Sequence, residues 1–197
     1  MVIVGITGGI GSGKSTVCDV WKKEGAYILN ADEFAKQLMV DNDEIRSEIK
    51  AAFGPESYTA EGELNRKFLS EEAFEKGRVD ELNAIIHPRL PAAVRERMKE
   101  AAEKGYKVGV YEAALLLESD HLDLFDYLVL VLADEKRRLQ WVKERDEASE
   151  KQVKSRMNKQ RNFENAVSQA DIVIRNEGTL EDLKKKAEVV FNKFLHS

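Results

Sequence analysis

The sequence has a single cysteine, Cys18, and no long apolar run. One thiol cannot form a disulfide within the chain, and sparing use of cysteine is typical of proteins in a reducing compartment. No stretch approaches the roughly 18 consecutive apolar residues that a membrane-spanning helix needs. The first residues also lack the basic start, apolar run and small-residue cleavage site of a secretory leader. We therefore expect a soluble, cytoplasmic protein with no membrane partner.

The chain also lacks a strong excess of charge of either sign. It carries 31 basic and 36 acidic side chains, which give a formal net charge of -5. A chain without a general positive field is not expected to bind nucleic acid, so any anion site must be local. With 197 residues and a hydrophobic content of 43%, the chain is expected to form one main compact core with insertions.

Short apolar, β-branched runs alternate with helical patterns along much of the chain. The first run precedes a glycine-rich loop and a helix that starts near Lys14 and stops at Gly25. The last helix opens with a capping box formed by Thr179 and Asp182. Strands separated by helical crossovers predict an α/β fold, in which a parallel sheet carries helices on both faces. The expected strands cover residues 2–6, 26–29, 107–111, 127–132 and 172–174.

Two stretches interrupt this alternation. Residues 41–104 contain helical patterns broken by turn signals and no convincing strand, which predicts an all-helical insertion. Residues 134–167, which we name the arm, are strongly charged, and a second capping box at Ser149 and Gln152 predicts two helices there. The expected nucleotide-binding core then consists of residues 1–40, 105–133 and 168–197.

Residues 5–16 read GITGGIGSGKST and carry the motif that points to function. The spacing G-x-x-x-x-G-K-[ST] is satisfied from Gly8 to Ser15, after an expected strand and before an expected helix, as in the phosphate loop (P-loop) of P-loop NTPases. In such a loop the backbone N–H groups and the helix N-terminus bind phosphate oxygens of a nucleoside triphosphate. Lys14 would add a charge at the β- and γ-phosphates, and the Ser15 hydroxyl would bind Mg²⁺. The expected ATP-binding residues of the loop are Gly9, Gly11, Ser12, Gly13, Lys14, Ser15 and Thr16.

The loop by itself does not say what happens to the phosphate. A GTP-dependent switch would need an Asp-x-x-Gly segment, which the chain lacks, and an Asn-Lys-x-Asp segment, where residues 158–161 read NKQR instead. A helical insertion and a basic arm favour a small kinase that phosphorylates a small molecule. Two alternatives stay open at this point, a kinase of the nucleoside monophosphate or shikimate type and a module that senses ATP without transferring phosphate.

Six segments spread along the chain carry more specific information: GITGGIGSGKS, ILNAD, IIHPRL, EAALLLE, ERDEASEKQVKSRMNKQ and ADIVIRNEG. In this order they resemble segments of the dephospho-coenzyme A (dephospho-CoA) kinase family, and the resemblance covers the chain nearly from end to end. It implies ATP-dependent phosphorylation of the 3′-hydroxyl of dephospho-CoA, the last step of coenzyme A biosynthesis, with Mg²⁺. It also implies a P-loop NTPase fold with a five-stranded parallel sheet, a CoA-binding insertion at residues 41–104 and a lid at residues 134–167.

Two carboxylates gain roles from this resemblance. Asp32, just after the second expected strand, would be the catalytic carboxylate that accepts the proton of the attacking hydroxyl, although its position suits the N-cap of the following helix equally well. Glu112, at the end of the third expected strand, would hold Mg²⁺ beside the substrate, and the alternative is an ordinary surface charge. The chain departs from the family pattern at Asn30, Glu112 and Ala114, where the family has aspartate, aspartate and proline.

The resemblance also assigns residues to the acceptor substrate. His87 and Arg89 would face the acceptor, with Arg89 binding a phosphate of the CoA moiety. The residues alone suggest a different role for His87. Because the residue before a proline avoids helical backbone, His87 is expected to cap a helix that begins at Pro88.

Further residues are assigned to the nucleotide. Arg145 would brace the phosphates during transfer, and Arg156 would lie on the nucleotide side and stack on adenine. Asn176 and Gly178 would form the turn that reads the adenine edge. A solvated charged face and a plain helix-entry loop are the structural alternatives. The expected catalytic residues are thus Asp32, Lys14 and Arg145.

Overall fold

The computed structural model describes residues 1–118, 121–158, 160 and 163–196. Its internal contacts divide the chain into two compact units. Unit 1 consists of Met1–Asn30 and Met98–Ser197, and unit 2 consists of Ala31–Arg97. Each unit has an apolar core of its own, so each is described by itself.

Five parallel strands form the sheet of unit 1, in the order β2-β3-β1-β4-β5. Every strand predicted from the sequence is confirmed, with bounds that agree to within one residue. The order reverses beside β1, because β2 and β3 lie on one side of it and β4 and β5 on the other. Ligands of open parallel sheets bind beside such a reversal, at the carboxyl ends of the strands. The strands are β1 (Val2–Thr7), β2 (Tyr27–Asn30), β3 (Val108–Glu112), β4 (Tyr127–Leu132) and β5 (Ile172–Arg175).

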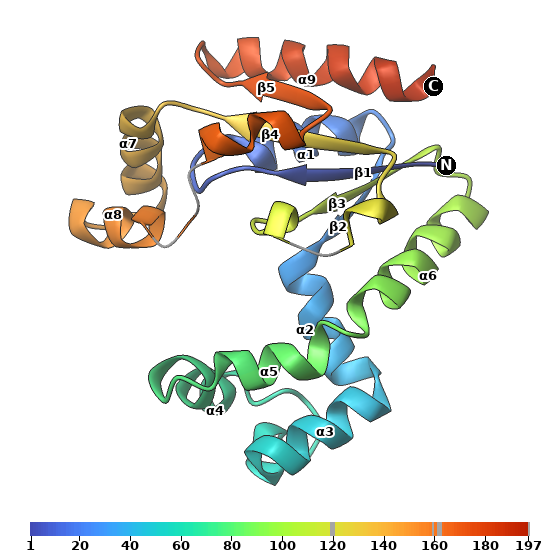
Figure 1. Ribbon diagram of the computed structural model, residues 1–197, viewed down its shortest axis with the longest axis vertical. Coiled ribbons are helices and arrows are strands. Elements are labelled where there is room, and N and C mark those ends of the chain that lie inside the picture. Colours follow the sequence, from blue (N-terminus) through green and yellow to red (C-terminus); the bar gives the residue numbers. More distant parts are fainter. Residues whose placement is uncertain (119–120, 159, 161–162, 197) are drawn as a thin grey trace. The chain divides into compact units, whose positions relative to one another are not determined.

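Two long helices, α1 (Lys14–Lys23) and α9 (Leu180–Leu195), lie side by side on one face of this sheet (Figure 1). Alternate residues of β1 and β4 are buried against them. Trp21 of α1 is completely buried, and its Nε1 donates a hydrogen bond to the Ala187 carbonyl of α9 at 2.8 Å. The predicted capping box at the start of α9 is confirmed. These contacts fix α1, and with it the loop that precedes α1, to the core.

The opposite face of the sheet packs against the end of α6 (Leu90–Glu103) and against short helical segments. Leucines of β4 that alternate with its valines are buried here. A Cβ at Gly5 of β1 would lie 2.7 Å from Leu116 Cδ2, so this close packing requires glycine. The short segments are η3 (Leu116–Glu118), η4 (Leu122–Leu124) and η5 (Phe163–Gln169).

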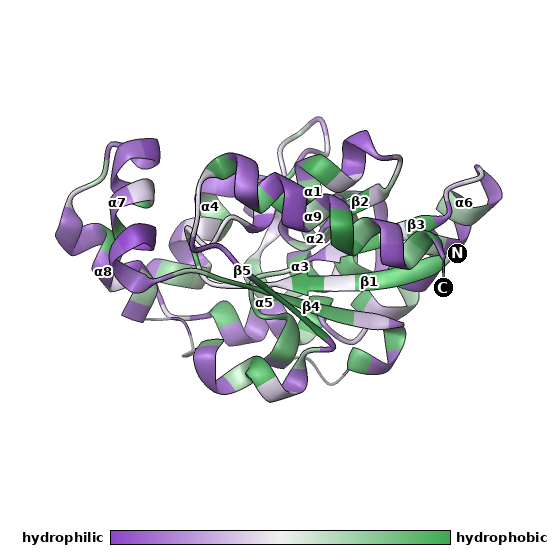
Figure 2. Cartoon of the chain, turned by 90° about the horizontal axis from the view of Figure 1, so that it is seen from above, coloured by the Kyte–Doolittle hydropathy of each residue, from purple (hydrophilic) through white to green (hydrophobic). Residues whose placement is uncertain are grey.

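The arm belongs to unit 1 and forms two helices, α7 (Glu135–Asp146) and α8 (Glu150–Asn158). The predicted division at Ser149 is confirmed, because Ser149 N donates to Gln152 Oε1 at 3.0 Å and Gln152 N donates to Ser149 Oγ at 3.4 Å. Much of the ribbon of α7 and α8 has the purple colour of hydrophilic residues in Figure 2. A small apolar cluster nevertheless holds the two helices together, through Val142, Val153 and Met157.

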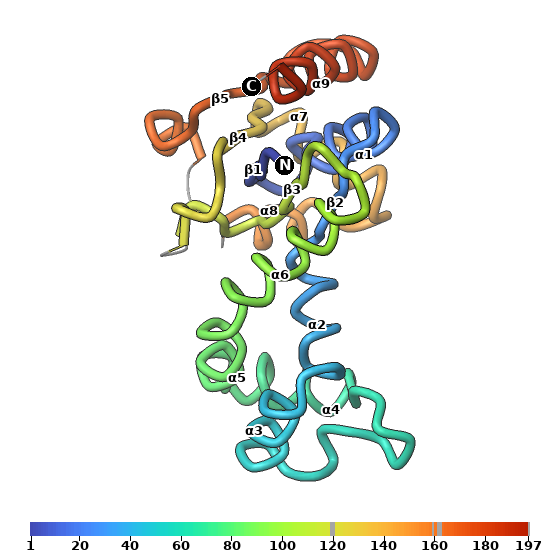
Figure 3. The backbone as a smooth tube through the Cα atoms, turned by 90° about the vertical axis from the view of Figure 1, so that its right-hand side faces the viewer, coloured from blue at the N-terminus to red at the C-terminus, as the bar shows by residue number. Residues whose placement is uncertain are grey.

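The regular secondary structure described in unit 2 is helical, apart from one isolated bridge between Tyr58 and Leu64. The tube in Figure 3 shows its helices from α2 to α5 in blue to green. The unit begins at Ala31, earlier than the predicted insertion, because α2 packs its apolar side against α3 and α5. The elements are α2 (Ala31–Asp41), α3 (Asp43–Phe53), η1 (Pro55–Ser57), α4 (Arg66–Ser70), the π-helical turn η2 (Glu71–Glu75), α5 (Val79–Ile86) and the first part of α6.

Among the described helices of both units, none combines the length and the apolar character that crossing a bilayer requires.

Candidate functional site

The glycine-rich loop lies between the carboxyl end of β1 and the first turn of α1. Gly11 and Gly13 have positive φ angles of 76° and 98°, a conformation that side chains rarely adopt. Gly13 is the N-cap of α1, and no side chain among the described residues caps the helix there. The backbone N–H groups of the first turn are therefore available to a ligand, and together with the helix dipole they form an anion site.

Asn176, which follows β5, is hydrogen-bonded to this loop. Its Nδ2 donates a hydrogen bond to the Ser12 carbonyl at 3.0 Å, and its backbone N–H donates to the Leu132 carbonyl at 2.7 Å. Asn176 is only 5% exposed, so both bonds are shielded from water. Its side chain thus fixes the loop, a contact that the sequence did not predict, while its assignment to the adenine edge stays a prediction.

A buried hydroxyl at the loop suits a phosphate ligand. Ser12 is 1% exposed, and among the described residues its Oγ has no hydrogen-bond partner. A buried polar atom without a partner is costly, and a phosphate oxygen is an acceptor that would satisfy it.

Lys14, Glu112 and Asn30 meet at the carboxyl ends of β2 and β3. Lys14 Nζ lies 3.6 Å from Glu112 Oε1, and Asn30 Nδ2 donates to Glu112 Oε2 at 3.2 Å. The Lys14 and Glu112 side chains are 15% and 13% exposed. Glu112 is therefore a partly buried carboxylate beside the loop lysine, and not the ordinary surface charge of the alternative interpretation.

Cys18, one turn after Lys14, is buried near these three residues, and its thiol is not reactive. Burial, followed by the negative charge of Glu112, raises the pKa of the Cys18 thiol far above its ordinary value, and the opposing effect of Lys14 is smaller. The thiol therefore stays protonated and is a poor nucleophile and a poor metal ligand.

A divalent cation at this site would have few protein ligands. Nowhere in the described part of the chain do three or more His, Cys, Asp or Glu side chains gather as a metal site. The Ser15 hydroxyl and the Glu112 carboxylate supply the oxygen ligands that Mg²⁺ prefers, and Mg²⁺ commonly completes its shell with water and substrate phosphates. The residues present thus fit a cation that arrives with a nucleotide, and they do not fit a metal bound by protein alone.

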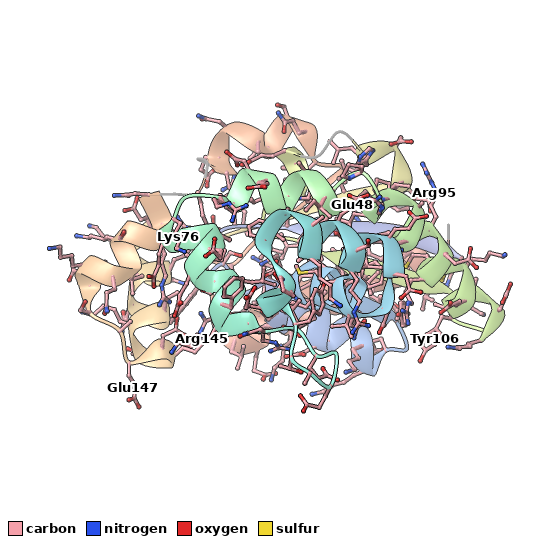
Figure 4. All side chains as sticks on the ribbon, turned by 90° about the horizontal axis from the view of Figure 1, so that it is seen from below. Glu48, Lys76, Arg95, Tyr106, Arg145 and Glu147 are labelled. Carbon is pink, nitrogen blue, oxygen red and sulfur yellow. The ribbon has the colours of Figure 1, made fainter. Side chains whose placement is uncertain are left out.

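Asp146 brings the two predicted arginines of the arm together. Arg145 Nε lies 2.7 Å from Asp146 Oδ1, and Arg156 Nη1 lies 3.0 Å from Asp146 Oδ2. Hydrogen bonds from Arg145 and the charges of both arginines lower the pKa of the Asp146 carboxyl. Figure 4 labels Arg145 and, in the turn after α7, Glu147. The sequence did not identify Asp146, because one acidic residue has no distinctive signal within a strongly charged segment.

Two more arginines that the sequence analysis missed attach the arm to the rest of unit 1. Arg137 Nη1 donates to the carbonyl groups of Glu177 and Gly178, so the turn predicted to read adenine is bound to α7. Arg138 Nη1 donates to the Ile10 carbonyl at 3.5 Å, and burial lowers the pKa of the Arg138 guanidinium. Neither arginine differs in sequence pattern from its charged neighbours on the arm.

In unit 2, Asp32 lies in the first turn of α2 and is exposed. The helix begins at Ala31, so Asp32 is not its N-cap and the capping interpretation is wrong. A carboxylate in a first turn is still favoured by the helix dipole.

The prediction that His87 leaves helical backbone and caps a helix at Pro88 is wrong. His87 has helical φ and ψ angles of -59° and -38° and ends α5, and its N–H donates to the Asn83 carbonyl at 2.8 Å. Pro88 lies in the turn that follows, and α6 begins at Leu90. The bias against helical backbone before proline is weaker here than the hydrogen bond that completes α5.

Arg89, in the same turn, forms ion pairs with two carboxylates of α3. Its Nη2 lies 2.5 Å from Glu48 Oε1, and its Nε lies 3.5 Å from Glu44 Oε2. Figure 4 labels Glu48 on α3. These contacts, led by the hydrogen bond to Glu48, raise the pKa of Arg89. His87 beside it is exposed.

The similarity to known proteins extends over nearly the whole chain. The family model described as dephospho-CoA kinase matches residues 2–182. A protein of Salinibacter ruber named dephospho-CoA kinase is 42% identical over 192 residues, which are 97% of this chain and 96% of that protein. One of Corynebacterium glutamicum with the same name is 37% identical and covers 93% of this chain and 95% of its own.

Solved structures share the fold. The crystal structure of TT1252 from Thermus thermophilus has a TM-score of 0.76 and 30% identity, over 98% of this chain and 97% of that one. A dephospho-CoA kinase from Campylobacter jejuni has a TM-score of 0.68 over 98% of this chain and 96% of its own, and its 22% identity supports the fold alone.

Proposed function

The chain belongs to the dephospho-CoA kinase family, and we propose that it transfers the γ-phosphate of ATP to the 3′-hydroxyl of dephospho-CoA, giving CoA and ADP. The observation that carries this proposal is the phosphate loop at residues 8–16, with Glu112 beside its lysine, Lys14, in a chain that matches the family over residues 2–182. The single cysteine supports a cytoplasmic location.

In this proposal the loop holds the phosphates of ATP and Lys14 neutralises the charge that develops on them. Its ammonium group, 3.6 Å from Glu112, moves from that ion pair to the β- and γ-phosphates. Mg²⁺, held by Ser15, by Glu112 and by the nucleotide, would neutralise phosphate charge when bound. The loop residues that contact ATP are Gly9, Gly11, Ser12, Gly13, Lys14, Ser15 and Thr16.

Asp32 accepts the proton of the attacking hydroxyl. The 3′-oxygen of dephospho-CoA forms a bond to the γ-phosphorus, the bond from that phosphorus to the β–γ bridging oxygen breaks, and ADP leaves with the electron pair. The proton passes to the Asp32 carboxylate and from there to solvent. Arg145 stabilises the transferring phosphoryl group, which requires it to exchange part of its contact with Asp146.

The remaining residues position the two substrates. Arg156, Asn176 and Gly178 lie on the nucleotide side, and His87 and Arg89 face the acceptor. The arm serves as a lid that excludes water, so that the hydroxyl and not water receives the phosphate. Arg89 meets a phosphate of dephospho-CoA by exchanging its ion pairs with Glu44 and Glu48.

The deciding experiment incubates the purified protein with Mg-ATP and, separately, dephospho-CoA, a set of nucleoside monophosphates, shikimate or no acceptor, while ADP release is measured. We expect rapid ADP release, with CoA as the product, only when dephospho-CoA is the acceptor. Faster turnover with a nucleoside monophosphate or with shikimate would assign the chain to another kinase activity. ATP binding without ADP release under any condition would favour a nucleotide sensor.

A further inference from the structure

Ile10 is an apolar residue within the glycine-rich loop, and its side chain belongs to the core of the arm. It packs against the cluster of Val142, Val153 and Met157. Every other described member of that cluster lies between residues 134 and 167. Figure 1 shows the loop between β1 and α1 beside α7, so the loop supplies one side chain to the helix pair.

Side chains of the arm also bind both backbone polar groups of Ile10. Its N–H donates a hydrogen bond to Gln160 Oε1 at 2.8 Å, and its carbonyl accepts the longer contact from Arg138 Nη1 at 3.5 Å. The residue at the turn of the loop is thus held by the arm in three ways, and the bond to Gln160 is the shorter of its two hydrogen bonds.

The two glycines that flank Ile10 make this close approach possible. A Cβ at Gly11 would lie 2.7 Å from Val142 Cγ2 and 2.9 Å from the Arg138 carbonyl oxygen. A Cβ at Gly9 would collide with the Arg138 guanidinium. Glycine at position 11 is therefore needed for contact with the arm as well as for the turn of the loop, whereas a side chain at position 9 would require the Arg138 guanidinium to move.

We propose that Ile10 and Gln160 are positioning residues that couple the arm to the phosphate loop. When the arm is seated, that is, in contact with Ile10, these residues fix the shape of the loop. Gln160 does not touch the reacting atoms in this proposal; it holds the Ile10 N–H and thereby the loop segment that leads into Gly11–Thr16. ATP that binds this loop favours the seated arm, and the seated arm favours ATP by the same factor. The inference rests on the proposed function only in taking ATP as the ligand of the loop.

The test compares Gln160→Leu with Gln140→Leu, which makes the same chemical change on the exposed face of α7, where Gln140 contacts Glu144. We expect Gln160→Leu to weaken ATP binding about fivefold to tenfold, as expected when a hydrogen-bonded N–H loses its acceptor. The KM for ATP should rise by the same factor, while the KM for dephospho-CoA should not change. Gln140→Leu should leave both constants at the wild-type values.

A second pair of variants separates positioning from general damage. Ile10→Ala removes most of the side chain from the cluster and should lower ATP affinity, whereas Ile10→Val keeps the branched shape and should restore most of it. If the two residues act together, the double variant of Ile10→Ala and Gln160→Leu will lose less affinity than the two single losses combined. Strictly additive losses would overturn the coupling.

Amide hydrogen exchange at Ile10 gives a measurement that needs no enzyme activity. Exchange should be faster in Gln160→Leu than in wild type or Gln140→Leu, with equal thermal unfolding temperatures in all three. Unchanged exchange and unchanged ATP affinity in Gln160→Leu would refute the inference. If these changes occur but wild type does not phosphorylate dephospho-CoA, the proposed function fails and the positioning role stands.

Discussion

Asn30 donates a hydrogen bond to Glu112 across adjacent strands, at the position where both strands end. The two residues are paired in the register of β2 and β3, and Asn30 Nδ2 lies 3.2 Å from Glu112 Oε2. These are two of the positions at which the chain departs from the pattern of the family it resembles. The two departures are in contact, so a longer carboxylate at 112 is matched by an amide donor at 30.

Asn30→Asp should change the pH dependence of the enzyme. It places a second carboxylate beside Glu112, and repulsion between like charges disfavours the state in which both carry a charge. The acidic limb of the kcat/KM profile for ATP should therefore move to higher pH by about one unit. Asn30→Ala, which removes the hydrogen bond without adding charge, is the control and should leave the limb in place. Superimposable profiles for Asn30→Asp and wild type would contradict the prediction.

Lys14→Ala should abolish most of the turnover without unfolding the protein. Removal of one charge that stabilises the transferring phosphoryl group is expected to lower kcat by about a hundredfold or more. Glu112 keeps its hydrogen bond from Asn30 in this variant, so the melting temperature should stay close to that of wild type. Lys22→Ala, on the exposed side of the same helix, is the matched control. Near-normal turnover in Lys14→Ala would remove the lysine from the mechanism.

Asp32→Asn tests the proposed proton acceptor. Loss of a general base is expected to lower kcat with dephospho-CoA by about a hundredfold, with little change in the KM for ATP. Glu33→Gln removes the next carboxylate in the first turn of α2, and with it the same kind of favourable interaction with the helix dipole. If steady-state kinetics give the two variants equal kcat values, Asp32 acts through the helix and not through proton transfer.

Asp146→Asn should alter the response of stability to acid. The folded-state pKa of Asp146 lies below its unfolded value of about 3.9, chiefly because Arg145 donates hydrogen bonds to it. The stabilisation is therefore complete above the unfolded pKa and is lost as pH falls through the folded pKa. The melting temperature of wild type should exceed that of Asp146→Asn at neutral pH, and the gap should close in acid. The gap should be small, because the pair is accessible to solvent. If the difference between the two melting temperatures does not depend on pH, the charge of Asp146 is not its cause.

Local patterns allowed most of the fold to be predicted. The strands are short apolar runs, and the starts of α8 and α9 are marked by capping boxes whose partners lie three residues apart. Each of these signals lies within one element, so the sequence of that element is enough to identify it. The backbone at His87 was predicted wrongly because a statistical bias before proline was outweighed by one hydrogen bond in α5.

The site could be predicted only in part, for a related reason. The phosphate loop is a compact motif, and the structure brings its lysine to Glu112 as the strand pattern suggested. The contacts of Asn176 with Ser12 and of Gln160 with Ile10 join residues that lie 164 and 150 positions apart. No periodicity or spacing records such pairs, because they depend on how distant elements pack.

The two tryptophans of the chain are divided between the core and the arm. Trp21 is sealed beneath α9, whereas Trp141 of α7 is partly open to solvent. A Trp21→Phe variant would therefore keep one tryptophan, Trp141, located on the arm that we propose as a lid. Its emission, excited apart from that of the five tyrosines, would report the proposed movement of the arm without an added dye.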